Sequence, residues 1–113
     1  MPKSNVLDPR SLAQWSPEKM GKATIFESER VLVGLNSFEP GQEHRLHAHA
    51  RMDKIYFVLE GQGTLLLEQG EERLEAGKLA IAPADQPHGV RNDSTGRLLL
   101  LAILCPAPTA KGH

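Results

Sequence analysis

Several residue types are scarce in this sequence, and each scarcity argues against a class of protein. The 113 residues include one cysteine, so no intrachain disulfide can form and nothing indicates an oxidising compartment. The formal net charge is -1 and the basic residues are scattered, which gives no electrostatic basis for binding nucleic acid or an anionic membrane surface. One Trp, one Tyr and three Phe supply few platforms on which bases could stack. We therefore expect neither a nucleic-acid partner nor a membrane partner.

Long hydrophobic runs are also missing. The apolar segment at residues 98–104 is much too short to span a bilayer. No basic segment leads into an apolar one at the N-terminus, as it would in a signal peptide. The composition therefore predicts a cytoplasmic protein, and the length allows one core but not two. Cys105 follows the apolar segment and is expected to be a buried core or edge thiol and not a nucleophile.

Glycine and proline interrupt the chain at short intervals, a pattern typical of many short strands and not of long helices. Residues 1–21 are predicted to be an irregular arm with one helical turn at most, in which Trp15 packs on the domain. Residues 22–104 should form the core of a single domain that takes in all 113 residues, and residues 105–113 a flexible tail. Strands are expected at 23–28, 31–38, 45–50, 54–59, 64–68, 72–75, 79–82, 88–92 and 97–104.

The regular spacing of these short strands predicts an all-β sandwich or barrel. Residues 60–63 (Glu-Gly-Gln-Gly) have the composition of a hairpin turn, and residues 69–71 should join the strands on either side of them in a second hairpin. The leucines at 65–67 and at 98–101 cannot all face one small core. Their second face should pack on another sheet or on a second subunit, which favours a homodimer.

Histidines are the candidate functional residues. His47 and His49 are two residues apart, so in an extended strand they leave from the same face and could bind one metal ion together. A later segment adds His88. His44 is odd-spaced from His47, so a continuous strand turns it to the rim or surface, whereas a bulge would return it as a fourth nitrogen ligand. His113, in the tail, is given no role.

The two histidine segments resemble the two motifs of the cupin superfamily, in particular those of its small single-domain, RmlC-like members. The first motif, G-x5-H-x-H-x3,4-E-x6-G, is matched by Gly41, His47, His49, Lys54 and Gly61. The second motif, G-x5-P-x-G-x2-H-x3-N, is matched by Gly77, Pro83, Asp85, His88 and Asn92. This resemblance implies a double-stranded β-helix, or jelly-roll, barrel in which the three motif histidines converge.

Two positions depart from these motifs. Asp85 replaces a turn glycine, which should be harmless because Asp tolerates a left-handed backbone. Lys54 stands where cupins usually carry a metal-binding glutamate, and a protonated lysine repels a divalent ion. Three arrangements are open. In the first, Lys54 turns away and three histidines hold the metal. In the second, a loop shift brings in Asp53 as a ligand, which strand alternation disfavours. In the third, no metal binds and Lys54 anchors a carboxylate or phosphate of the ligand.

The resemblance implies a divalent transition metal as cofactor, with His47, His49 and His88 as ligands, because imidazole nitrogen suits Fe, Mn, Ni, Co, Cu and Zn. The functional prediction is a protein that binds or acts on a small organic molecule. As an enzyme it would be an oxygenase, an isomerase or a lyase, with Lys54 as a candidate catalytic group and Tyr56, in phase with it, as a pocket or core residue. The alternatives are a non-enzymatic small-molecule sensor and a metal-free isomerase or epimerase.

Overall fold

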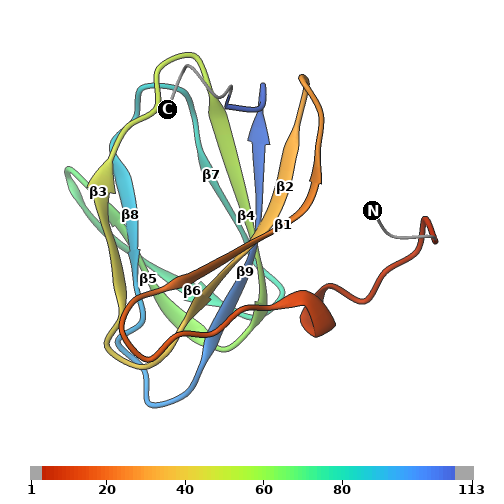
Figure 1. Cartoon of the computed structure of the whole chain (residues 1–113). Helices are drawn as coiled ribbons and strands as arrows, with labels where there is room; N and C mark the ends of the chain where they lie inside the picture. The colour runs from red at the N-terminus through yellow and green to blue at the C-terminus, as the bar shows by residue number, and fades with distance from the viewer. Residues whose placement is uncertain (1–3, 109–113) are drawn as a thin grey trace.

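The computed structural model describes residues 4–108 and is built almost entirely of strands (Figure 1). The tail residues 109–113, with His113, and residues 1–3 lie outside the described part. One 3-10 turn, η1 (Pro9–Leu12), precedes nine strands: β1 (Gly21–Glu27), β2 (Leu32–Phe38), β3 (Glu43–His47), β4 (Asp53–Glu60), β5 (Gln62–Leu67), β6 (Gly70–Glu75), β7 (Leu79–Ala82), β8 (His88–Arg91) and β9 (Leu98–Cys105). Among the described residues, no helix has the length and apolar character needed to cross a membrane.

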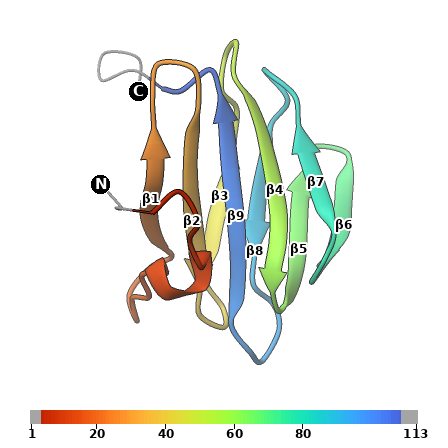
Figure 2. The same ribbon diagram turned by 90° about the vertical axis from the view of Figure 1, so that its right-hand side faces the viewer.

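The strands form two antiparallel sheets that face each other as the walls of a flattened barrel (Figure 1). The five-stranded sheet has the order β1-β2-β9-β4-β7, and Figure 2 shows these strands side by side. The four-stranded sheet has the order β3-β8-β5-β6. This arrangement is a double-stranded β-helix, so the prediction of an all-β jelly-roll barrel is confirmed. The predicted strands correspond one for one to the nine observed, with ends displaced by at most three residues.

One predicted turn is wrong. Residues 60–63 do not close a hairpin, because β4 pairs with β7 and β9 while β5 pairs with β6 and β8. The chain instead crosses from one sheet to the other at Gly61, whose φ is 85°. A Cβ atom there would lie 2.0 Å from the carbonyl oxygen of Arg97, so only glycine fits this close crossing. The second predicted hairpin, between β5 and β6, is present.

The apolar core occupies one end of the barrel and leaves the other end for a pocket. Lys54 pairs with Leu104 at one end of the β4–β9 ladder, and Val58 pairs with Leu100 toward the other. Alternate residues of each strand face inward, as the period of an extended chain requires. The buried core contains Phe38, Tyr56, Val58, Leu65, Leu74, Ala80, Val90, Leu98, Leu100 and Ala102. The remaining inward positions, near the start of β4 and the end of β9, line the pocket described below.

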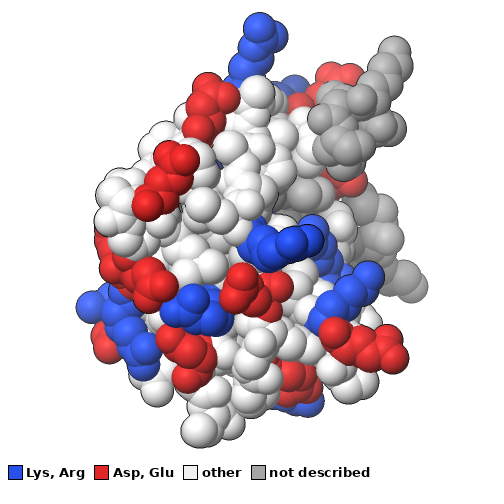
Figure 3. Space-filling model, turned by 90° about the vertical axis from the view of Figure 1, so that its left-hand side faces the viewer, with Lys and Arg blue, Asp and Glu red and all other residues white. Residues whose placement is uncertain are grey.

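The outer faces of the two sheets differ in character. The outer face of the four-stranded sheet carries interspersed positive and negative side chains (Figure 3), including the ion pair of Arg91 with Glu71 at 3.2 Å. The outer face of the five-stranded sheet is apolar, with Leu79 63% and Ile81 61% exposed on β7. Cys105, expected to be a buried core or edge thiol, is instead exposed at the end of β9.

The N-terminal arm packs on the barrel, as predicted. The guanidinium of Arg97 lies 4.4 Å from the centre of the Trp15 ring, a cation–π distance. Arg10 donates a hydrogen bond of 3.0 Å from its Nη2 atom to the carbonyl oxygen of Leu59. The single 3-10 turn of the arm begins after Asp8, whose carboxylate accepts a hydrogen bond from the Arg10 backbone N–H.

Candidate metal centre

The pairing of β3 with β8 brings the predicted histidines together. His47 is the last residue of β3 and stands directly opposite His88, the first residue of β8. His49 lies two residues beyond β3, in the connection to β4. The ring centre of His47 lies 4.8 Å from that of His49 and 4.5 Å from that of His88. The structure thus unites the three side chains, although His49 belongs to a loop and not to the predicted strand.

Hydrogen bonds hold two of the three rings in the orientation that a metal needs. The Nδ1 atom of His47 lies 2.8 Å from the carbonyl oxygen of Arg45, and that of His88 lies 3.0 Å from the carbonyl oxygen of Gln86. A carbonyl only accepts, so each Nδ1 carries the proton and each Nε2 presents a lone pair. Both Nε2 atoms are buried without a hydrogen-bond partner among the described residues. Orientation of a ligating histidine by a backbone carbonyl is common in metal sites.

The electrostatics of the cluster favour neutral imidazoles. The pKa of His88 is lowered to about 4, mainly by burial and less by the nearby His47 and Lys54, against a raising effect of its hydrogen bond to the Gln86 carbonyl. Burial also lowers the pKa of His47, opposed by its hydrogen bond to Arg45. Only a neutral imidazole can bind a metal ion. These histidines are therefore ready to act as ligands at neutral pH without first losing a proton.

The three residues fit a divalent transition metal. Their ligand atoms all lie within 4.8 Å of one another. An ion that binds imidazole nitrogens at about 2.1 Å in tetrahedral geometry holds them about 3.4 Å apart, so small side-chain rotations would close the site. The donor set consists of nitrogen alone, which suits several first-row metals and does not select one of them.

His44 enters the same pocket because β3 is irregular. The register between β3 and β8 shifts between His44 and His47, and the two rings stack with centres 4.3 Å apart. The predicted bulge is therefore present and turns His44 into the pocket, away from the surface position of a continuous strand. The cluster of possible metal ligands consists of His47, His49 and His88, so a role of His44 as a fourth ligand stays a prediction. Gly89 permits the bulge: a Cβ atom on it would lie 2.5 Å from the carbonyl oxygen of His44. Burial, then the charge of His47, lower the pKa of His44 to about 3.

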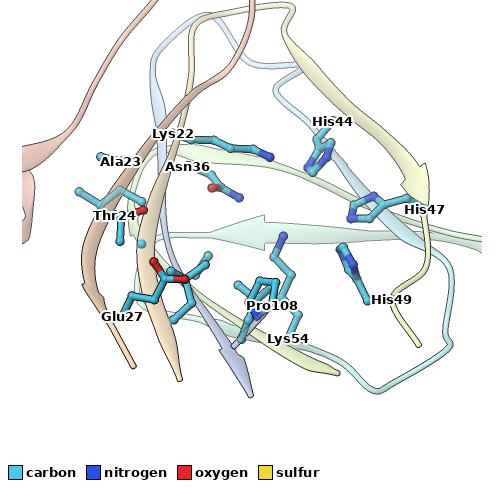
Figure 4. A pocket seen from close by; sticks show the side chains of 15 residues that line it. Lys22, Ala23, Thr24, Glu27, Asn36, His44, His47, His49, Lys54 and Pro108 are labelled. Carbon is cyan, nitrogen blue, oxygen red and sulfur yellow. The ribbon is translucent and has the colours of Figure 1, made fainter. Parts of the chain in front are cut away.

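Lys54 does not turn away from the histidines. It is 5% exposed and lines the same pocket, with its amine directed into the cavity (Figure 4). Its Nζ atom lies 4.9 Å from the centre of the Tyr56 ring. Burial, and secondarily the charge of Lys22, lower the pKa of Lys54 to about 8. The amine is therefore mostly protonated at neutral pH, and its charge lowers the pKa values of His47 and His88.

Asp53 and Tyr56 do not belong to the cluster of possible metal ligands. Asp53 is exposed, and its carboxylate accepts a hydrogen bond of 2.9 Å from the backbone N–H of Ala84. Strand alternation places it on the face opposite to Lys54, as the sequence indicated. Tyr56 is fully buried in the apolar core, 6.2 Å from the His88 ring centre, and its hydroxyl has no partner among the described residues. Tyr56 therefore packs in the core beside the histidine cluster, and of the two predicted roles, pocket residue or core residue, it has the second.

His44, His47, His49 and Lys54 line a cavity of about 310 Å3 (Figure 4). Its opposite wall comes from β1 and β2 and contains Lys22 and Asn36, two polar residues that sequence reasoning missed. Asn36 could have been noticed as a polar residue inside an apolar strand. Apolar side chains of Leu32, Ala102, Leu104 and Pro108 complete the lining, and Thr24 and Glu27 stand on the β1 side.

The turn positions of the second motif behave as predicted. Asp85, which replaces the motif glycine, has a left-handed backbone with φ of 70°. Asn92 fixes a turn, because its amide nitrogen donates to the carbonyl oxygens of Phe38 and Gly96 at 2.9 and 2.8 Å. Its side-chain oxygen accepts the backbone N–H of Ser94. These contacts hold the end of β8.

Comparisons with known proteins identify the family to which the chain belongs. The Cupin_2 family, described as a cupin domain, matches residues 34–104. The crystal structure of TT1209 from Thermus thermophilus is 42% identical, with a TM-score of 0.88, covering 93% of this chain and 100% of that one. A structure of a conserved protein with a double-stranded β-helix domain from Klebsiella pneumoniae has a TM-score of 0.87 at 22% identity, over 92% of this chain and 91% of that one. The second likeness shows the fold alone.

The curated relatives are longer proteins. Auxin-binding protein 4 of Zea mays is 27% identical over 93 residues, which are 74% of this chain and 45% of the maize protein. The chain spans about half the length of the curated relatives it matches.

Proposed function

Because the chain belongs to the Cupin_2 family of cupin domains, we propose that it binds a divalent transition metal through His47, His49 and His88 and acts on a small organic molecule in the adjoining cavity. One observation carries the proposal: the Nε2 atoms of His47 and His88 are buried without partners among the described residues while a carbonyl holds each Nδ1. A buried polar atom left without a partner is costly in a structural role. A metal ion would satisfy both atoms at once.

The reaction class that we propose is metal-dependent oxygenation, with isomerisation and lyase chemistry as further options. A metal held by three histidines would supply a Lewis acid or redox centre with open coordination positions. Residues of the chain would hold the metal, limit the access of water and bind the substrate. The three imidazoles hold the centre, the apolar side chains of Leu104 and Pro108 limit the access of water, and the Lys54 ammonium is placed to offset negative charge on a substrate.

Metal analysis tests the proposal. Protein purified without a nickel column should contain close to one equivalent of a transition metal by inductively coupled plasma mass spectrometry, or accept one after reconstitution. Replacement of His88 by Gln should abolish this uptake, while replacement of Arg30, an exposed residue in the turn between β1 and β2, by Gln should leave it intact. Sub-stoichiometric metal that cannot be restored would overturn the metal centre. Oxygen consumption with candidate substrates then tests the reaction class.

A second candidate is a non-enzymatic small-molecule binding protein. The name of the maize relative, an auxin-binding protein, favours this alternative. It predicts that ligands raise the melting temperature of the metal-free protein as much as that of the metal-loaded protein. A metal-free isomerase or epimerase, with a histidine as base and Lys54 as acid, predicts instead an activity that survives chelators.

The proposal includes a homodimer that buries the apolar outer face of the five-stranded sheet. Strand register places Ile81, Ile55, Ile103, Val33 and Phe26 in one row across all five strands. Of these, Ile81 is 61% and Phe26 47% exposed. Contiguous apolar patches of this kind are uncommon on monomers.

Light scattering during gel filtration should give twice the monomer mass. Replacement of Ile81 by Lys should shift it to the monomer, whereas Leu46→Lys, on the opposite sheet, should not. A monomeric wild type would overturn the dimer.

A cytoplasmic location, with its reducing conditions, suits the exposed and unpaired Cys105, and cell fractionation tests it.

A further inference from the structure

Two positive side chains face the cavity, and neither has a negative partner in the described part of the chain. Lys54 enters from β4 and is 5% exposed. Lys22 enters from β1 and is exposed at the open side (Figure 4). Neither amine forms an ion pair with a carboxylate among residues 4–108. The charge on Lys22 is one of the two causes that lower the pKa of Lys54, and no negative group opposes it. Burying an ammonium without a counter-ion is unfavourable unless a ligand supplies one.

A buried amide donor completes this group. Asn36 is 6% exposed and stands beside Lys22 in the register of β1 and β2. Its Nδ2 atom is buried and has no acceptor among the described residues. Figure 4 shows the amide on the same wall as Lys22, facing the histidines and the amine of Lys54. The cavity therefore gathers two ammonium groups and one amide N–H group, three donors that could converge on one acceptor group.

We propose that Lys22, Asn36 and Lys54 form an oxyanion subsite that binds the carboxylate or phosphate group of a small organic ligand, whose remaining atoms extend toward the three histidines. This inference rests on the proposed function in one respect, because it assigns the class of ligand that the metal-bearing pocket receives. It also explains how Lys54 can occupy the position of the motif glutamate. A bound anion neutralises the lysine and so reduces its repulsion of a metal ion.

The other features of the cavity agree with this assignment. Glu27 is the only acidic residue in the described lining, and it is exposed and makes no ion pair with either lysine. It therefore leaves both charges available. The volume of about 310 Å3 suits a small ligand. Leu32, Ala102 and Leu104 provide an apolar surface for its carbon skeleton.

Calorimetric titration of the full-length protein with three probes tests the subsite. The probes are malonate, inorganic phosphate and malonamide, a neutral analogue of malonate with a similar shape. Each is measured on protein of known metal content, as purified and after chelation. We expect binding of malonate or phosphate in both preparations, at least tenfold tighter than any binding of malonamide, because charge-assisted hydrogen bonds are the strong ones. Tighter binding of malonate than of phosphate would identify a carboxylate ligand, and the reverse order a phosphorylated one.

Variants of the three proposed donors test whether the anion binds at this subsite. The replacements Lys54→Met and Lys22→Met should each weaken the anion about tenfold or more, and Asn36→Asp should abolish binding through charge repulsion. Lys78→Met, on the remote β6–β7 turn, should have no effect. Lys54→Met removes a buried charge, so it should fold, which a thermal melt verifies. Equal binding of malonamide, or anion binding unchanged in Lys54→Met and Lys22→Met, would overturn the subsite. Anion binding to a protein that takes up no metal would support the subsite and overturn the metal centre alone.

Discussion

Restoring the motif glutamate is the most direct test of how the lysine and the metal interact. The Lys54→Glu variant replaces a positive charge beside the three histidines by a carboxylate. At a separation of about 5 Å and an effective dielectric constant of about 20, one pair of unit charges interacts by about 3 kcal/mol. The replacement removes repulsion and adds attraction, toward an ion of charge two. Even after a large discount for screening by water and for relaxation, metal affinity should rise by about 100-fold or more.

The matched variant Lys54→Met separates the two contributions. It removes the charge and keeps an unbranched side chain, so its affinity should fall between those of the wild type and Lys54→Glu. Competition with a chromophoric chelator measures all three proteins. Without metal, Lys54→Glu should melt at a lower temperature than the wild type, because its carboxylate is buried at a 5% exposed position; metal should reverse the order. If Lys54→Glu binds metal no more tightly than the wild type, Lys54 lies outside the reach of the metal and the reasoning fails.

Three further outcomes follow from the same geometry. Folding keeps His88 at a pKa of about 4 against 6.5 in the unfolded chain, so below pH 6.5 the unfolded state takes up the proton first. In urea unfolding of the metal-free protein, His88 alone should lower the stability by about 2 kcal/mol between pH 7 and pH 5, and His44, whose pKa is also lowered, should add to this loss; His88→Asn should remove the part that His88 contributes. Gly89→Ala should lower the free energy of unfolding by about 1–3 kcal/mol and weaken metal binding. Gly96→Ala, whose added Cβ would meet nothing within 4 Å, should do neither, and equal effects of the two variants would refute the role of the bulge. Tyr56→Phe removes a buried hydroxyl without a partner among the described residues, so its melting temperature should match or exceed that of the wild type, and a drop of several degrees would reveal a partner.

The strands could be predicted because their signals are local. Glycine and proline interrupt the chain between short apolar segments, and each such segment became one strand. The hairpin between β5 and β6 was equally local. The turn at residues 60–63 failed because its composition does not reveal which strand the next segment joins. Gly61 serves a close crossing between sheets against Arg97, a residue 36 positions later in the chain.

The candidate site shows the same division. The spacing of His47 and His49 and the motif position of His88 were enough to predict that they converge. The direction of His44 was not predictable, because it depends on a bulge that Gly89 of another strand makes possible. Asp53 faces away from the pocket, as simple alternation implied.

By itself, the sequence determined the fold class, the three histidines of the cluster and the unusual lysine among them, since strand signals and motif spacing act over a few residues. Only the tertiary structure decided what surrounds that lysine. Lys22 and Asn36 lie on strands that reach Lys54 through the five-stranded sheet, and His44 joins through an irregular strand pair. The physical reason is that strand pairing and sheet closure bring together side chains that are distant in the chain. Burial then removes the water that would otherwise stabilise their charges.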